Sequence, residues 1–82
     1  MEYVTYILFS ETLNKYYIGH TNDMVRRLAE HNRKKGKFTD AGIPWILVYS
    51  ETFTDKKEAF NREMQIKNKK SRKYIEFIIN NQ

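Results

Sequence analysis

The sequence predicts an α+β fold, a small three-stranded sheet flanked by three helices. Residues 2–10 and 45–53 are rich in the aromatic and β-branched side chains that favour strands. Residues 24–35 and 57–68 place apolar side chains at helical spacing. The predicted order is strand, strand, helix, strand, helix, helix. A sheet covered by helices is the natural way for such an order to enclose a core.

Local signals place the first three elements. Residues 12–14 are expected to connect the first strand to an antiparallel partner over residues 15–20. Thr21 or Asn22 is expected to cap the first helix, because both side chains can accept a hydrogen bond from its free N–H groups. Asp23 would then lie in the first turn, where the helix dipole favours a negative charge.

The second half of the chain is read in the same way. Residues 36–44 hold two glycines and a proline and are predicted to form a loop before the third strand. Asp55 begins the second helix, and its spacing to Glu58 is that of a capping box. Ser71 is expected to cap a last helix over residues 72–79.

Length and composition narrow the classes further. With 82 residues the chain is expected to form one domain, residues 1–82. It has no cysteine, which excludes a disulfide scaffold and a thiolate zinc site. No leader or membrane span is recognised, so a cytoplasmic protein without membrane contact is expected. The net charge of +5 and a pI of about 9.5 favour nucleic acid as the partner.

Glu63 is predicted to lie on the apolar face of its helix. On a helical wheel with Ala59 at zero, Phe60 and Ile66 bound an apolar arc from about 340° to about 100°. Glu63 falls at about 40°, inside that arc. An ionised carboxylate facing a core is costly unless a cation pairs with it. Two interpretations stay open: a structural ion pair, with Arg27 as one partner, or a metal-binding carboxylate.

Arg27 and His31 lie four residues apart on one edge of the first helix. Met24, Val25 and Leu28 are predicted to form the apolar stripe of this helix. Relative to Met24, Arg27 lies at about 300° and His31 at about 340°, so both flank the stripe. A guanidinium matches two phosphate oxygens, and a histidine of near-neutral pKa can move protons. The alternative, in which both side chains only cover the edge of the core, stays open.

Tyr6 and Tyr17 lie on the two strands of the predicted hairpin, and either phenol can hydrogen-bond a water or a phosphate. Lys15 is a candidate cation that would favour ionisation of a phenol. Gly19, near the end of the second strand, allows a phosphate or another backbone to come close. Tyrosine is equally a good strand and core residue, so the pattern alone does not choose the functional tyrosines.

Two basic clusters are candidate nucleic-acid contacts. The loop cluster contains Lys34, Lys35 and Lys37, and the cluster between the last two helices contains Lys67, Lys69, Lys70, Arg72 and Lys73. Such clusters can hold phosphates in a salt-dependent way. The alternative is a solvated surface that keeps a small protein in solution.

Together these segments resemble the GIY-YIG nuclease family, in its small standalone bacterial form. The resemblance covers residues 3–80. The second half-motif is complete at residues 17–19 (YIG), whereas the first keeps only its tyrosine at residues 4–6 (VTY). The runs YIGHTNDMVRRLAEHN and REMQIK are the most specific matches. The resemblance implies a three-stranded antiparallel sheet flanked by helices, like the N-terminal nuclease half of the bacterial excision-repair incision subunit.

The resemblance also implies roles for the candidate residues. Glu63 would bind one Mg²⁺ or Mn²⁺ ion, and Arg27 would stabilise the charged transition state. Tyr6 would activate water, assisted by His31.

The remaining matches are looser. Tyr17 would hydrogen-bond at the site, and an exchange of roles between Tyr6 and Tyr17 stays open. Lys15, Gly19 and Asn80 are accessory candidates.

The function implied is a metal-dependent endonuclease that hydrolyses DNA phosphodiester bonds, in keeping with a role in DNA repair or recombination. A monomer or weak dimer is expected, and target choice is expected to be weak or to come from a protein partner. One alternative is a non-catalytic nucleic-acid-binding module on the same fold. Another is a basic scaffold in which Glu63 and Arg27 form a structural pair.

Overall fold

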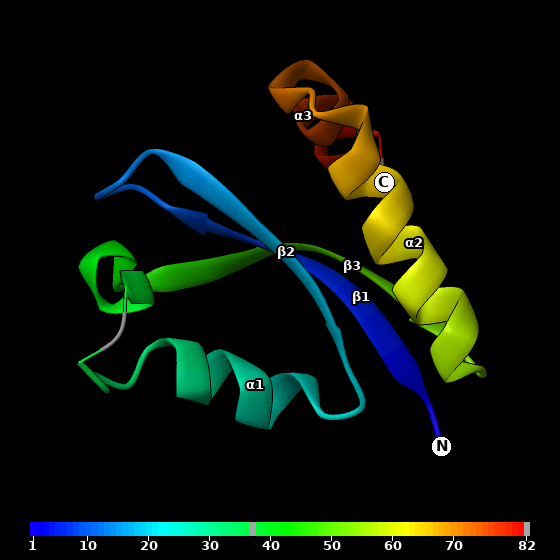
Figure 1. The fold of residues 1–82 in the computed structure, drawn as a ribbon, viewed down its shortest axis with the longest axis horizontal. Helices are drawn as coiled ribbons and strands as arrows, with labels where there is room; N and C mark the ends of the chain where they lie inside the picture. Colours follow the sequence, from blue (N-terminus) through cyan, green and yellow to red (C-terminus); the bar gives the residue numbers. More distant parts are fainter. Residues whose placement is uncertain (37, 82) are drawn as a thin grey trace.

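The computed structural model describes residues 1–36 and 38–81, with only the backbone at positions 38 and 39. Its elements in chain order are β1 (Tyr3–Ser10), β2 (Lys15–Thr21), α1 (Met24–His31), the short 3-10 helix η1 (Phe38–Gly42), β3 (Trp45–Phe53), α2 (Lys56–Lys69) and α3 (Arg72–Asn80). The predicted order of strands and helices is confirmed, and the expected loop before β3 contains η1 (Figure 1).

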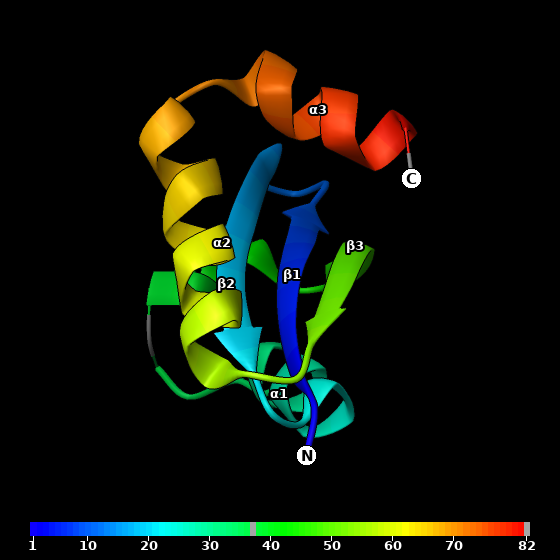
Figure 2. The ribbon, with the colours of Figure 1, turned by 90° about the vertical axis from the view of Figure 1, so that its right-hand side faces the viewer.

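The sheet has the order β2-β1-β3, and both pairings are antiparallel. β1 is the central strand, so Tyr6 lies opposite Gly19 on β2 and opposite Ser50 on β3. α1 covers one face of the sheet, and α2 and α3 cover the other (Figures 1 and 2). β2 is therefore an edge strand, around which side chains from the two covered faces can approach each other.

Successive side chains of β1 point to opposite faces of the sheet and build two separate cores. Tyr6 and Leu8 point toward α1 and pack with Trp45. Ile7 points the other way and packs with Ile66 of α2. We call these two sides the α1 face and the α2 face.

α1 has a different cap from the one predicted, and it ends four residues early. Its cap is Asp23, whose side chain accepts a hydrogen bond of 3.1 Å from the N–H of the third residue after it. Thr21 instead accepts one from the Asp23 N–H. The helix was expected to continue to residue 35 but ends at His31. It stops there because the Asn32 side chain is held by the backbone N–H and C=O of Trp45, at 2.6 and 2.9 Å.

The buried face of α1 is narrower than predicted. Met24 and Leu28 pack against the core of the α1 face, but Val25 is 84% exposed, so its place in the apolar stripe was wrong. An eight-residue helix that touches the sheet along one edge buries only a thin stripe. Arg27 and His31, expected to flank this stripe, are half-buried beside Leu28.

The caps of the last two helices are confirmed. The Asp55 side chain accepts from the Lys57 N–H at 2.9 Å, and Ser71 accepts from the Tyr74 N–H at 3.1 Å. Between the helices, Lys70 has a left-handed backbone with a φ of 49°. Within the described residues, no helix is long and apolar enough to cross a membrane.

Candidate active site

The phenol of Tyr6 lies beneath the backbone of β2. Its side chain is almost fully buried, and Gly19 lies directly across from it. A Cβ at position 19 would come within 2.6 Å of the Tyr6 hydroxyl oxygen and 2.8 Å of Cζ. Gly19 is therefore needed for the close approach of this ring. The sequence had suggested that the group approaching Gly19 would be a phosphate or another backbone.

Tyr6, Tyr17 and His31 form one aromatic cluster on the α1 face. Tyr6 Oη lies 3.1 Å from His31 Nε2, and the Tyr17 and His31 rings meet edge to face with centroids 4.6 Å apart. Burial is the main cause that raises the pKa of Tyr6. Burial, reinforced by the positive charge of Arg27, lowers the pKa of His31. At neutral pH the cluster thus pairs a protonated phenol with a neutral imidazole.

Arg27 projects into a small cavity beside this cluster. Its Nε is buried and has no hydrogen-bond partner among the described residues. The nearest carboxylate oxygen is that of Glu30, at 3.7 Å. The cavity has a volume of about 210 Å³ and is also lined by His20 and Lys56. A buried donor without a hydrogen-bond partner is costly, and the positive guanidinium of Arg27 beside this cavity favours an anionic group there.

Glu63 is buried, as predicted, but it does not pair with Arg27. His20 Nδ1 lies 2.6 Å from one carboxylate oxygen, and Lys67 Nζ lies 2.6 Å from the other. Burial alone would raise the pKa of Glu63, but these two hydrogen bonds outweigh it and lower the pKa. Because an ionised carboxylate only accepts hydrogen bonds, His20 Nδ1 carries a proton and Nε2 is left for another partner.

The five predicted site residues do not share one face of the sheet. Tyr6, Tyr17, Arg27 and His31 belong to the α1 face, whereas Glu63 belongs to the α2 face. The two groups approach each other around the edge strand β2, because the cavity that holds Arg27 is also lined by the histidine bound to Glu63.

The acidic side of the site offers a single buried carboxylate to a cation. Within the described part of the chain, no three His, Cys, Asp or Glu side chains are grouped so that they could hold a metal ion. A single buried carboxylate fits Mg²⁺ or Mn²⁺, since Mg²⁺ is commonly bound by one or two carboxylates together with substrate phosphates and water. Glu63 can supply that carboxylate if Lys67, whose side chain is 45% exposed, moves away.

The accessory candidates are divided between the site and other surfaces. Lys15 lies on β2 on the same face as Tyr17, two residues away. Asn80 is the exposed last residue of α3. The C-terminal end of α3 lies on the β3 side of the sheet, away from β2 (Figure 2).

The predicted basic clusters are likewise divided. Lys67, Lys70 and Arg72 line a groove beside β2, whereas Lys69 lies over the ring of Tyr74. Lys34, Lys35 and Lys73 are exposed, and Lys37 lies outside the described residues.

Two contacts of the site were not anticipated. His20 follows the YIG motif and shares the face of Ile18, two residues before it, which is the signal that could have placed it near the α2 face. Lys67 stands four residues after Glu63, a spacing that brings a glutamate and a lysine together on a helix. This spacing favours Lys67 over Arg27 as the partner of Glu63.

Comparison with known proteins gives matches along most of the chain. Residues 2–75 match the GIY-YIG catalytic domain. A UPF0213 protein of Streptococcus pneumoniae is 48% identical over 68 residues, which cover 82% of this chain and 69% of the relative. One from Halobacterium salinarum is 47% identical over 53 residues, 63% of this chain and 69% of the relative.

One solved structure also matches. The solution structure of a UPF0213 protein from Bacillus halodurans aligns with a TM-score of 0.61 and 28% identity. The alignment covers 98% of this chain and 84% of that one.

Proposed function

The chain belongs to the GIY-YIG family, a family of nucleases, and from this premise we propose that it is a metal-dependent endonuclease that hydrolyses DNA phosphodiester bonds. Such an enzyme would serve DNA repair or recombination in the cytoplasm. The net charge of +5 supports a polyanionic substrate.

One observation carries the proposal. The cavity beside β2 is lined by Arg27, with its unpartnered Nε, and by His20, which holds the ionised Glu63. A phosphodiester placed there would accept hydrogen bonds from Arg27 and have a carboxylate nearby. Arg27 would stabilise the additional negative charge that develops on the phosphoryl oxygens during attack.

Tyr6 and His31 can supply the proton transfers. The Tyr6 hydroxyl donates to the neutral His31 Nε2 and, as its proton moves to the imidazole, accepts a proton from the attacking water. The new P–O bond forms as the bond to the leaving oxygen breaks, and that oxygen is protonated by solvent. The lowered pKa of His31 supports this direction, because the imidazole must be free of its second proton beforehand.

Glu63 would hold a divalent cation together with substrate phosphate oxygens and water. The bound cation would supply charge neutralisation at the leaving oxygen. Lys67 would then be released from Glu63 and be free to contact a phosphate.

Cleavage by matched variants tests the proposal. Labelled DNA of plain, single-stranded and branched form is incubated with Mg²⁺ and purified protein. Arg27→Ala and Glu63→Gln are each expected to lower the cleavage rate by about 10²–10³-fold, as when a group that stabilises transition-state charge is removed. Arg26→Ala removes an exposed arginine of the same helix and is expected to cut like the wild type.

The same experiment defines the result that would contradict the proposal. Equal cleavage by wild type, Arg27→Ala and Glu63→Gln would assign the activity to a contaminant and reject this site.

A nucleic-acid-binding module without catalysis is the second candidate. It is favoured by the contacts of Glu63, since both of its carboxylate oxygens are already occupied by His20 and Lys67. This alternative predicts binding that weakens with salt, with no cleavage of any of the three DNA forms in Mg²⁺ or Mn²⁺.

A further inference from the structure

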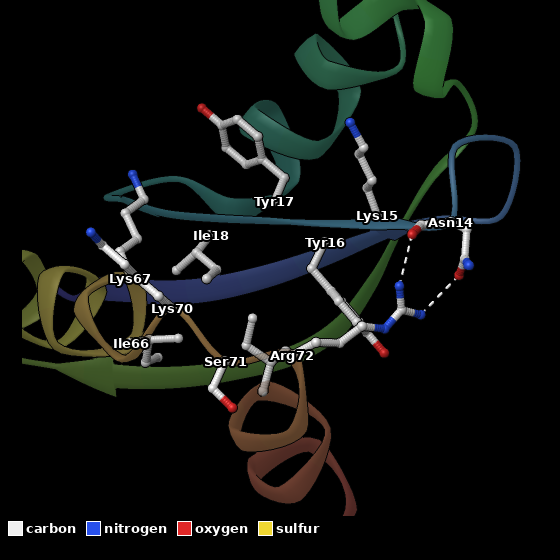
Figure 3. A pocket seen from close by; sticks show the side chains of 11 residues that line it. Asn14, Lys15, Tyr16, Tyr17, Ile18, Ile66, Lys67, Lys70, Ser71 and Arg72 are labelled. Atoms are coloured by element: carbon white, nitrogen blue, oxygen red, sulfur yellow. Dashed lines mark hydrogen bonds between the residues drawn. The ribbon is translucent and has the colours of Figure 1, made fainter.

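A groove of about 480 Å³ lies between the edge strand β2 and the corner that joins α2 to α3 (Figure 3). Its floor is apolar and includes Ile18, Ile66 and Ile75, with the ring of Tyr16 beside them. Its rim is basic and consists of Lys15, Lys67, Lys70 and Arg72. We call this the β2–α3 groove. An apolar floor with several cations around it suits a ligand that has a flat apolar part and a negative charge.

The groove adjoins the candidate active site. Lys67 lines the groove and also holds Glu63 at 2.6 Å. Tyr17 lines it and also contacts the His31 ring. A chain of nucleotides that crosses the site can therefore continue into the groove without leaving the surface of β2.

The rim cations are not equivalent. Arg72 is fixed, because it donates to the backbone and side-chain oxygens of Asn14 at 2.9 and 2.8 Å (Figure 3). It also donates to Glu76 at 3.1 Å. Lys70, in contrast, forms no ion pair within the described residues. Arg72 therefore closes one end of the groove, while Lys70 leaves its charge available to a ligand.

The backbone at Lys70 adds an independent observation. Its φ of 49° and ψ of 39° lie in the left-handed region, where a Cβ is disfavoured and glycine is the usual residue after a helix. The chain nevertheless has a lysine there, and this lysine lines the groove. A strained residue at the rim of a basic groove points to a role for its side chain in binding.

We propose that the β2–α3 groove binds one unstacked nucleotide of the nucleic acid, with its base on the isoleucine floor beside Tyr16 and its phosphate against Lys70. Planar bases rest on apolar and aromatic side chains whatever their sequence, and lysines hold the phosphate as point charges. That this nucleotide is a neighbour of the scissile phosphate rests on the proposed nuclease function. Binding in the groove does not.

The variant Lys70→Gly separates binding from stability. Affinity for a fluorescent twelve-residue oligothymidylate is measured by anisotropy in EDTA, so that no metal-dependent cleavage interferes. Lys70→Gly is expected to bind about fivefold to tenfold more weakly, because one phosphate contact is lost, and its slope against salt should fall by about one. Its melting temperature is expected to rise, because glycine relieves the left-handed backbone.

Lys69→Ala is the matched control. It removes the same charge from the neighbouring residue, which does not line the groove. It is expected to weaken binding by less than twofold. Equal loss in Lys69→Ala and Lys70→Gly would show a diffuse electrostatic surface and overturn the proposal.

An abasic oligonucleotide of the same length and charge tests whether a base binds on the isoleucine floor. The wild type is expected to prefer oligothymidylate by about tenfold, in line with the stacking of one base on an apolar platform. Ile75→Trp, which fills the floor, is expected to reduce this preference toward one. Equal affinity of the wild type for both probes would overturn the base site even if the tryptophan variant failed to fold.

The results also separate this site from the nuclease proposal. Preferential, Lys70-dependent binding without cleavage by the wild type would retain the groove and reject the nuclease. Cleavage with no difference between Lys69→Ala and Lys70→Gly would retain the nuclease and reject the groove.

Discussion

The two faces of the sheet treat their charged groups differently. On the α2 face, Glu63 is hydrogen-bonded by His20 and Lys67, and Arg62 Nε donates to Glu51 at 2.7 Å. On the α1 face, Arg27 keeps a buried Nε that has no hydrogen-bond partner among the described residues and only a 3.7 Å contact with Glu30. His31 there is neutral because burial lowers its pKa.

This contrast separates groups that hold the fold from groups that await a ligand. Paired charges lose stability when one partner is removed, because the other is left uncompensated. A buried donor without a hydrogen-bond partner costs stability, and that cost is removed when an anion accepts from it. Variants on the two faces should therefore differ in what they damage.

The largest effect on stability is expected at Gly19, on the α1 face. In Gly19→Ala the new Cβ would lie 2.6 Å from Tyr6 Oη, so the ring or the strand must move. Such overpacking costs about 1–3 kcal/mol of unfolding free energy, measured as the urea midpoint. Combining Gly19→Ala with Tyr6→Phe, which removes the nearest atom, should recover part of this loss. An unchanged midpoint in Gly19→Ala would mean that Tyr6 does not pack against this strand.

The next effect compares the two faces directly. Glu63→Gln presents an amide NH₂ where His20 or Lys67 now donates, and should cost about 1–2 kcal/mol of unfolding free energy. Arg27→Met keeps the length of the side chain, removes the unpartnered donor and should change stability by less than about 0.5 kcal/mol. Equal destabilisation by both variants would remove the distinction between a face whose charges are hydrogen-bonded and a face on which Arg27 Nε is not.

Acid titration gives the two faces different pH windows. The folded pKa of His31 is lowered, so the unfolded chain takes up its proton first, and stability falls as pH drops below about 6.5. The folded pKa of Glu63 is lowered as well, so its contribution persists above about pH 4.3 and is lost only as pH falls through the folded value.

Urea unfolding at several pH values checks this assignment. Between pH 6.5 and 5, His31→Asn should lose less stability than the wild type, whereas Glu63→Gln should fall in parallel with it. A parallel fall in wild type and His31→Asn would contradict the lowered pKa of His31.

Sequence patterns predicted the elements well because strands, caps and helical faces depend on nearby residues. The burial of Glu63 followed from its place between Ala59 and Ile66 on the wheel. The partners of Glu63 could not be predicted from the wheel. Because residues of an edge strand can face either side of the sheet, nearness in the sequence does not show which groups reach Glu63. Only strand parity, which places His20, and the i,i+4 spacing, which places Lys67, select these two residues over Arg27.

The end of α1 could not be predicted for a related reason. Residues 32–35 are compatible with helix, but Asn32 is held by Trp45, thirteen residues away. A long-range contact of this kind overrides local propensity. The closeness of Tyr6 to Gly19 likewise depends on strand register. The sequence predicted that the two strands form a hairpin, and the pairing of β1 with β2 sets the register.

The smallest expected effect tests how thin the contact of α1 with the sheet is. Val25 is 84% exposed, so Val25→Ala should lie within about 0.5 kcal/mol of the wild type and can be slightly stabilising, since alanine is the better helix former. Leu28→Ala, on the packed edge of the same helix, should cost more than Val25→Ala by at least about 1 kcal/mol, because it removes apolar contact with the core. Urea midpoints compare the two variants. If Val25→Ala were as damaging as Leu28→Ala, α1 would be rotated from the orientation that brings Arg27 to the cavity.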